Sequence, residues 1–150
     1  TRLPVWLKGV LHPLDARQAQ ALQVAGLIVS NHGGRALDTA PPTAQALPLV
    51  RDAVGREMPL IVDGGIRRGT DVLKAIALGA QAVMIGRPVV HALAAGGPLA
   101  VARTIRLLRD ELEMAMALTG CRTLGDAGPA LLDPTLSADN AKKPYHHDWD

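Results

Sequence analysis

Three short apolar runs recur along the chain, and a longer segment with helical periodicity follows each of them. The runs are GLIV at 26–29, PLIV at 59–62 and AVMI at 82–85. A strand that is apolar at nearly every position is covered on both faces, which is typical of parallel sheets. A further strand is expected in PVWLKGV, at 4–10. The alternation therefore predicts an α/β fold with four parallel strands and intervening helices.

Capping and stop signals around these runs set the expected boundaries. Strands are expected over 4–10, 26–31, 59–65 and 81–88, and helices over 15–26, 44–54, about 70–79, 89–95 and 99–119. Asp15 and Thr43 are the predicted N-caps of the first two helices. After Gly120 the pattern fades, so residues 1–125 are predicted to form the folded α/β unit and 126–150 a polar tail.

The composition excludes several classes of function. The chain has 150 residues, of which 48% are hydrophobic and 20% charged, and this suits one compact domain. Its 16 basic and 14 acidic residues leave a net charge of +2, which gives no basis for nucleic-acid binding. A single cysteine, Cys121, allows no internal disulfide and favours a reducing compartment. We expect a soluble, cytoplasmic protein, and leave peripheral membrane association open.

Polar residues and glycines stand at the carboxyl ends of all four predicted strands. They are Lys8 and Gly9, then Ser30, Asn31 and His32, then Asp63, Gly64 and Gly65, and finally Gly86 and Arg87. In parallel α/β folds, ligands bind at the carboxyl ends of the strands. Four strand ends that deliver such residues to one rim predict a binding site there.

The last two strand ends indicate an anion site. DGGIRRG places two glycines just before Arg67 and Arg68, and IGRP repeats the pattern with Gly86 and Arg87. Glycines let backbone N–H groups approach an anion, and arginine offers paired donors to phosphate. A tight turn explains one Gly–Gly pair equally well, whereas the same chemistry at two adjacent strand ends favours phosphate.

The first two strand ends indicate different chemistry. Lys8 interrupts an apolar strand, so its ammonium needs a negatively charged acceptor or a route to solvent. His32 can take a proton near neutral pH, and Arg35 can bind a carboxylate through two hydrogen bonds. A loop histidine is more often structural than catalytic, so this pair alone does not define an active site.

With these residues assembled, the chain resembles the FMN-dependent α-hydroxy acid dehydrogenase and oxidase family, the group of glycolate oxidase, lactate oxidase and flavocytochrome-type lactate dehydrogenases. LKGV, SNHGGR, DGGIRRG and IGRP look like its successive signatures over about residues 4–125. The resemblance implies FMN as cofactor and, for residues 1–125, the C-terminal half of a TIM (β/α)8 barrel. Such barrels need about 250 residues. We therefore expect a complementary N-terminal half or a second copy to complete the barrel, and a homo-oligomeric full-length enzyme.

The resemblance also implies a role for each site residue. His32 would be the active-site base and would bind the substrate with Arg35, which would hold the carboxylate of a 2-hydroxy acid. Lys8 would lie beside flavin N1 and the C2 carbonyl. The other cofactor contacts would come from Ser30 at the flavin ring, Asp63, Gly64, Gly65, Ile66 and Arg67 at the ribityl chain and phosphate, and Gly86 and Arg87 at the phosphate. The implied reaction oxidises a 2-hydroxy acid of lactate, glycolate or mandelate type to the 2-oxo acid.

Several alternatives stay open. Oxidase and dehydrogenase are not distinguished, and neither are the routes that remove a proton from the substrate hydroxyl or from its α-carbon. Another FMN or phosphate-binding barrel enzyme is a second possibility, although SNHGGR is not a signature of type 2 isopentenyl diphosphate isomerase or of inosine monophosphate dehydrogenase. A third is an incomplete flavin-binding half without activity. No metal is expected, because His146, His147, Asp148 and Asp150 are interpreted as a solvated cluster in the tail.

Overall fold

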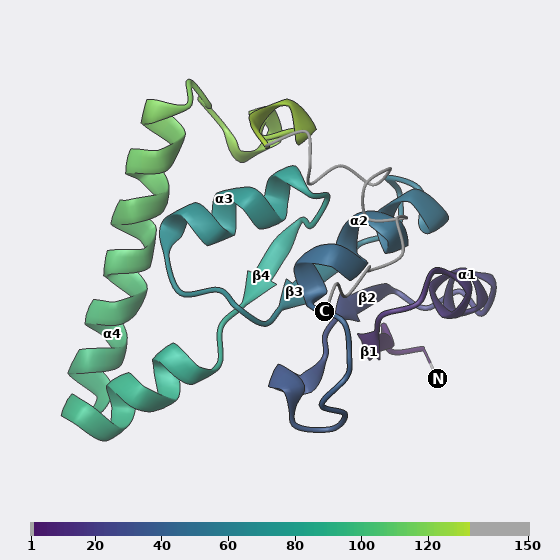
Figure 1. Ribbon diagram of the computed structural model, residues 1–150, viewed down its shortest axis with the longest axis horizontal. Coiled ribbons are helices and arrows are strands. Elements are labelled where there is room, and N and C mark those ends of the chain that lie inside the picture. The colour runs from purple at the N-terminus through teal and green to yellow at the C-terminus, as the bar shows by residue number, and fades with distance from the viewer. Residues whose placement is uncertain (1, 133–150) are drawn as a thin grey trace, which may run out of the picture.

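The computed structural model describes residues 2–132 (Figure 1). The strands are β1 (Trp6–Val10), β2 (Gly26–Val29), β3 (Leu60–Asp63) and β4 (Ala82–Met84), and the helices are α1 (Pro13–Ala21), α2 (Thr43–Val54), α3 (Gly69–Ala77) and α4 (Arg87–Leu118). Three short 3-10 helices are η1 (His32–Gly34), η2 (Leu124–Asp126) and η3 (Pro129–Leu131). Most of the predicted polar tail, including the His146–Asp150 cluster, lies outside the described residues.

The four strands form one sheet in the order β1-β2-β3-β4, and every neighbouring pair is parallel. A helix joins each strand to the next, as Figure 1 shows. Right-handed crossovers between strands in this order place the connecting helices on one face of the sheet, which is the winding of a (β/α)8 barrel. The predicted α/β fold with four parallel strands is confirmed.

The core lies between the sheet and helices α1, α2 and α3. Leu27 of β2 and Leu60 of β3 are paired in register and fully buried, and they belong to one cluster with Leu47 and Val50 of α2. Burying each side chain of this size contributes roughly 1.5–3 kcal/mol. This layer holds the two central strands in place, and it therefore fixes the position of their carboxyl ends.

The opposite face of the sheet, hereafter the inner face, is only partly covered within the described residues. Side chains alternate along a strand, so the residues between the core positions point to this face. They include Ile28 and Ile61, which are half-buried, and Trp6 of β1 and Met84 of β4, which are 39% and 41% exposed. The outer strands of the sheet, β1 and β4, each pair with one neighbour among the described residues.

The start of α1 differs from the prediction. The helix begins at Pro13, and its N-cap is His12, whose Nδ1 accepts a hydrogen bond from the backbone N–H of Leu14 at 3.2 Å. The prediction that Asp15 is the N-cap is therefore wrong, and Asp15 lies in the first helical turn. Proline is favoured at the first helical position because its missing N–H is not needed there, and this signal outweighed the carboxylate.

The predicted helices 89–95 and 99–119 are the two parts of α4. Non-helical backbone angles at Gly96 and Gly97 separate them, and Figure 1 shows the sharp bend. The longer part packs on α3, where a Cβ atom at Gly69 would lie 2.0 Å from the backbone nitrogen of Leu112. Only glycine permits this approach of two helices. Within residues 2–132, no helix is long and apolar enough to cross a lipid bilayer.

Candidate functional site

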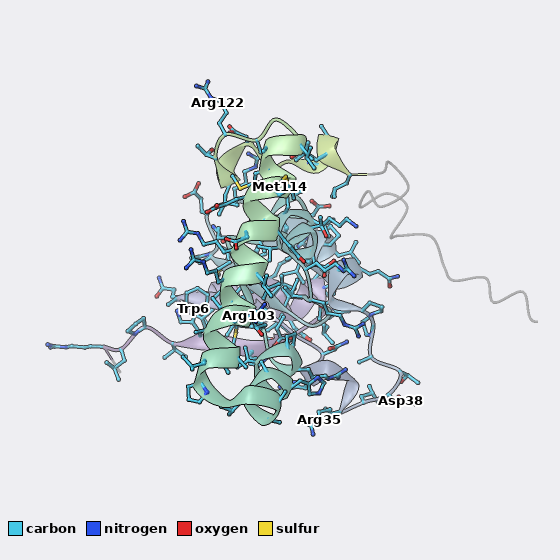
Figure 2. All side chains as sticks on the ribbon, turned by 90° about the vertical axis from the view of Figure 1, so that its left-hand side faces the viewer. Trp6, Arg35, Asp38, Arg103, Met114 and Arg122 are labelled. Atoms are coloured by element: carbon cyan, nitrogen blue, oxygen red, sulfur yellow. The ribbon has the colours of Figure 1, made fainter. Side chains whose placement is uncertain are left out.

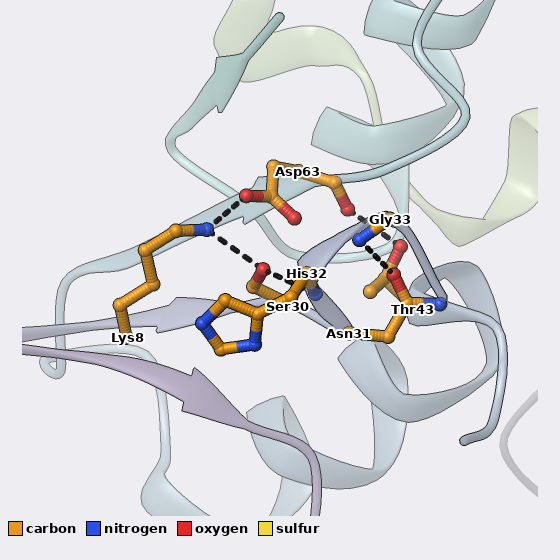
Figure 3. A network of polar contacts seen from close by, with 7 residues as sticks. All are labelled: Lys8, Ser30, Asn31, His32, Gly33, Thr43 and Asp63. Atoms are coloured by element: carbon orange, nitrogen blue, oxygen red, sulfur yellow. Dashed lines mark hydrogen bonds and ion pairs between the residues drawn. The ribbon is translucent and has the colours of Figure 1, made fainter. Parts of the chain in front are cut away.

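Three predicted site residues meet on the inner face at the carboxyl end of the sheet (Figure 3). The Lys8 ammonium donates a hydrogen bond to Ser30 Oγ at 2.7 Å and forms an ion pair with Asp63 Oδ2. The side chains of Lys8 and Asp63 are 36% and 19% exposed, and Ser30 is fully buried. Lys8 therefore has the negatively charged acceptor that its place in an apolar strand requires.

The Asp63 carboxylate is only half satisfied. Its Oδ1 atom is buried and has no hydrogen-bond partner among the described residues. The backbone of Asp63 is held firmly, because its carbonyl oxygen accepts a hydrogen bond from Thr43 Oγ1 at 2.6 Å. The prediction that Thr43 is an N-cap is wrong, since Thr43 is the first residue of α2 and Pro42 is the N-cap. A buried unpaired acceptor costs roughly 1–3 kcal/mol, so Oδ1 is a candidate acceptor for a ligand hydroxyl group.

His32 stands on η1 in a left-handed conformation, with φ of 55°. Its backbone N–H donates to Ser30 Oγ at 3.1 Å, and the next N–H, that of Gly33, donates to Asn31 Oδ1 at 3.0 Å. The imidazole lies against β1, where a Cβ atom at Gly9 would approach His32 Cε1 to 2.8 Å. Figure 3 shows the ring next to Ser30, on the side of Lys8. Gly9 at the end of β1 and the Ser30 hydroxyl after β2 therefore determine where the His32 imidazole lies.

The guanidinium groups of Arg35 and Arg67 are exposed and have no hydrogen-bond partner in the described part of the chain. Arg35 follows η1 directly, and Figure 2 shows it at the lower edge of the molecule. Arg67 is anchored by its backbone N–H, which donates to Asp71 Oδ2 at 2.9 Å. No hydrogen bond joins either guanidinium to His32, so both remain available to an anion.

The N-termini of α3 and α4 differ in how their backbone donors are used. At α3, the N–H of Gly69 donates to Glu111 Oε2 at 2.8 Å, and the N–H of Arg68 donates to Asp71 Oδ2 at 2.9 Å. At α4, the N-cap is Gly86, which has no side chain to bond the first turn. Open N–H groups and the helix dipole attract anions. At α3, the carboxylates of Asp71 and Glu111 already bond the N-terminus. At α4, the N–H groups of Val89 and Val90 donate to the Gly86 carbonyl oxygen and Pro88 has none, so in this turn the N–H of Arg87 is the donor without a partner in the described part of the chain.

The Arg87 side chain connects the α4 N-terminus to the loop of the predicted base. Its Nη2 donates a hydrogen bond to the carbonyl oxygen of Gly33. A Cβ atom at Gly33 would lie 2.8 Å from that nitrogen, and Gly33 has φ of 70°. The left-handed backbone favours glycine there, and a side chain would have to displace the Arg87 guanidinium. The rim after β4 and the rim after β2 are therefore in direct contact.

The loop after β3 presents backbone to the same rim. Gly64 and Gly65 have φ of 89° and 79°, and a Cβ atom at Gly65 would meet nothing within 4 Å. Ile66, predicted to contact the cofactor, has a buried side chain that belongs to the core cluster. Its side chain therefore anchors the loop, and the backbone is the part of this loop that a ligand can approach.

Three residues that position the site were given no role in it from the sequence, although Gly9 and Asn31 stand at the predicted strand ends. Asn31 folds the η1 loop, and the run Asn-His-Gly-Gly at 31–34 is a turn signal that was present in the sequence. Gly9 makes room for the imidazole, and Thr43 holds the Asp63 carbonyl across 20 residues of sequence. No local pattern reports those two contacts. Among the described residues, no group of three or more His, Cys, Asp or Glu side chains is placed to bind a metal ion.

Comparison with known proteins identifies relatives of this chain. The family model of the FMN-dependent dehydrogenases matches residues 1–134. The L-lactate oxidase of Alicycliphilus denitrificans is 56% identical over 135 residues, which are 90% of this chain and 37% of that protein. The peroxisomal (S)-2-hydroxy-acid oxidase GLO4 of Oryza sativa subsp. japonica is 56% identical over 126 residues, or 84% of this chain and 34% of that protein.

Solved structures agree with this relationship. Mandelate oxidase with benzoyl-formic acid matches with a TM-score of 0.82 and 51% identity, over 85% of this chain and 38% of that one. A mandelate oxidase variant with a monooxide FMN adduct matches equally well, over 85% and 40% of the two chains. The chain thus spans a little over a third of the length of these relatives, and the four strands with their helices correspond to part of a TIM barrel. This chain belongs to the FMN-dependent dehydrogenase family.

Proposed function

We propose that this chain forms part of an enzyme that uses FMN to oxidise a small 2-hydroxy acid to the 2-oxo acid. The observation that carries the proposal is the convergence of Lys8, Ser30, Asp63 and His32 at one end of the sheet. The names of the relatives, oxidases of lactate, other 2-hydroxy acids and mandelate, support the same substrate class.

The residues at this rim fit the parts of FMN. The buried Oδ1 of Asp63 lacks a donor, and the ribityl chain carries hydroxyl groups that can supply one. The open backbone at Gly65, the α4 N-terminus and the Arg87 guanidinium suit a phosphate. The Lys8 ammonium suits the edge of the flavin ring that becomes negatively charged. When bound, FMN supplies the two-electron acceptor that protein side chains lack.

Three side chains of this chain carry out the steps that FMN does not: substrate binding, proton transfer and stabilisation of negative charge. Arg35 binds the carboxylate of the acid, because a guanidinium matches a carboxylate with two parallel donors. His32 accepts a proton from the substrate, and its imidazole lies against Gly9 of β1. Lys8 provides a fixed positive charge, which stabilises negative charge that develops nearby.

We also infer that further βα units cover the inner face and the β1 and β4 edges. The apolar side chains of Trp6 and Met84 are 39% and 41% exposed there, and edge strands carry unpaired backbone groups. About 60% of the length of the mandelate oxidase variant lies outside the part that this chain matches. The rest of a longer protein, a companion chain or a second copy can supply those units, and size-exclusion chromatography with light scattering separates a monomer from an assembly.

The proposal is tested by anaerobic reduction of the FMN-loaded protein with L-lactate, glycolate and (S)-mandelate. At least one acid should bleach the yellow colour. His32→Asn should keep the colour and slow the bleaching by about 100- to 10,000-fold, the usual contribution of a general base. His91→Asn, the same change at an exposed position of α4, is the matched control and should bleach at the original rate.

Two outcomes would contradict the proposal. Bleaching of His32→Asn at the original rate would remove the imidazole from the reaction. A protein that binds FMN but is bleached by none of the acids would instead be a flavin-binding half without activity of its own, the main alternative.

A further inference from the structure

Two hydrogen bonds converge on the side chain of Ser30 (Figure 3). Its Oγ accepts one from the Lys8 ammonium at 2.7 Å and one from the backbone N–H of His32 at 3.1 Å. Ser30 is fully buried, and a hydroxyl oxygen has two acceptor positions, so both are in use. The charged side chain of β1 and the backbone of η1 therefore share a single oxygen atom.

The backbone that Ser30 holds is strained. A φ of 55° is uncommon for a residue other than glycine and costs roughly 1–2 kcal/mol. Such a conformation persists only when surrounding contacts impose it. Asn31 bonds the N–H groups of Gly33 and Gly34, and Arg87 bonds the Gly33 carbonyl oxygen, so these bonds close the turn from its far side. The Ser30 bond, by contrast, is made to the backbone N–H of His32 itself. The direction in which the imidazole leaves the backbone depends on that bond.

We propose that Ser30 is a positioning residue for His32. Its hydroxyl imposes the left-handed backbone and thereby aims the imidazole along the inner face. Lys8, itself held by Asp63, fixes the rotation of that hydroxyl from the other side. The role of this positioning in catalysis rests on the proposed function of His32, but the positioning itself is a property of the chain without cofactor. It is separate from any contact that Ser30 makes with the flavin ring.

The test is an NMR comparison of the full chain and Ser30→Ala without FMN. The three-bond HN–Hα coupling and the 13Cα shift of His32 report its φ angle. Both should move away from left-handed values in Ser30→Ala, a change that removes one atom and leaves no large cavity. Ser30→Cys keeps the shape of the side chain but accepts hydrogen bonds weakly, and it should shift the same signals if the alanine variant does not fold.

Thr43→Val is the matched control. It removes another buried hydroxyl at the same rim, one that bonds Asp63 and does not bond His32. The His32 signals should stay in place in this variant. The proposal is overturned if His32 keeps its left-handed values without the Ser30 hydroxyl, or if Thr43→Val moves the signals as far as Ser30→Ala does.

A kinetic measurement on the FMN-loaded protein separates positioning from direct contact with the flavin. Ser30→Ala should lower the rate of reduction about 100-fold, as expected for a misplaced base. In the His32→Asn background the same change should have no further effect, because a residue that acts through His32 has nothing left to position. An equal loss in both backgrounds would contradict the proposal. Failure of the unaltered protein to react would contradict the proposed function. The positioning of His32 by Ser30 would then be decided by the NMR comparison alone.

Discussion

The two ends of the same sheet are built in different ways. At the amino end, the Arg51 guanidinium donates to the carbonyl oxygens of Gly55, Met58 and Gly79, with distances of 2.9 Å to Met58 and 2.7 and 2.9 Å to Gly79. At the carboxyl end, Oδ1 of Asp63, the last residue of β3, has no hydrogen-bond partner among the described residues, and the backbone of His32, after β2, is left-handed. At the amino end, the backbone carbonyl oxygens are hydrogen-bonded within the chain. At the carboxyl end, polar groups remain without a partner among the described residues and can bind a ligand.

This difference shows where stability and function lie in the molecule. Burial lowers the pKa of Arg51, and the like charge of Arg56 lowers it further, but the carbonyl oxygens around Arg51 offset the burial of its charge. The glycines differ in the same way. Gly79 at the amino end is packed against the Arg51 side chain, whereas Gly65 at the carboxyl end faces open space. The strained backbone of His32 and the unpaired Oδ1 of Asp63 both lie at the carboxyl end, where a ligand can bind.

The largest effect on stability is expected at the amino end. Arg51→Ala removes the donor to three backbone carbonyl oxygens, so the free energy of unfolding should fall by about 2–4 kcal/mol. Arg56→Ala removes an exposed neighbour of the same charge and should change it by less than about 0.5 kcal/mol. Urea denaturation measures both variants. Equal effects of the two substitutions would show that the hydrogen bonds of Arg51 do not stabilise this end.

A pair of glycine substitutions separates backbone strain from ligand binding. Gly65 and Gly120 have φ of 79° and 73°, and a Cβ atom at either position would meet nothing within 4 Å. Alanine should therefore cost about 1–2 kcal/mol of stability at each position. Gly65→Ala should also weaken FMN binding at least tenfold, since its methyl group points into the proposed phosphate site, and Gly120→Ala should not. Equal FMN affinity of the two variants, measured by fluorescence titration, would place the phosphate elsewhere.

The smallest effect on stability is expected from replacing the ion pair of the site. Lys8→Met combined with Asp63→Leu removes two charges, one of them largely buried, and the unpaired Oδ1 as well. Replacing such a pair by apolar side chains is often neutral or stabilising, so the change should lie within about 1 kcal/mol of zero or favour the folded state. FMN affinity should fall sharply in the same protein. A loss of stability comparable to that of Arg51→Ala would mean that the carboxyl end is also built for stability.

The fold was largely predictable from the sequence, because apolar runs and helical periodicity report which residues are buried. The strand positions follow from this, and so does the break of α4, which GGP at 96–98 marks. The caps of α1 and α2 were not predictable in the same way. Proline competed with Asp15 at the first, and a contact with the distant Asp63 took the hydroxyl of Thr43 at the second.

The meeting of Lys8, Ser30 and Asp63 was also predictable, because carboxyl ends of parallel strands lie at one edge of the sheet. The individual contacts within the site were not. Lys8 and Asp63 are 55 residues apart and meet only when β1, β2 and β3 are in register. The sharing of Ser30 between Lys8 and His32 likewise depends on how η1 folds back after β2. Contacts of this kind need the tertiary structure, because no spacing in the sequence encodes them.

The most direct test of the central claim compares the affinities of the full chain for FMN and for riboflavin, which lacks the phosphate. A charge-assisted contact to the phosphate contributes about 1.5–3 kcal/mol, so FMN should bind at least tenfold more tightly. Arg87→Ala should reduce that difference, since Arg87 is the first residue of α4, at the proposed phosphate site. Equal affinity for the two flavins in the unaltered protein would contradict the claim that the carboxyl end of this sheet is an FMN site.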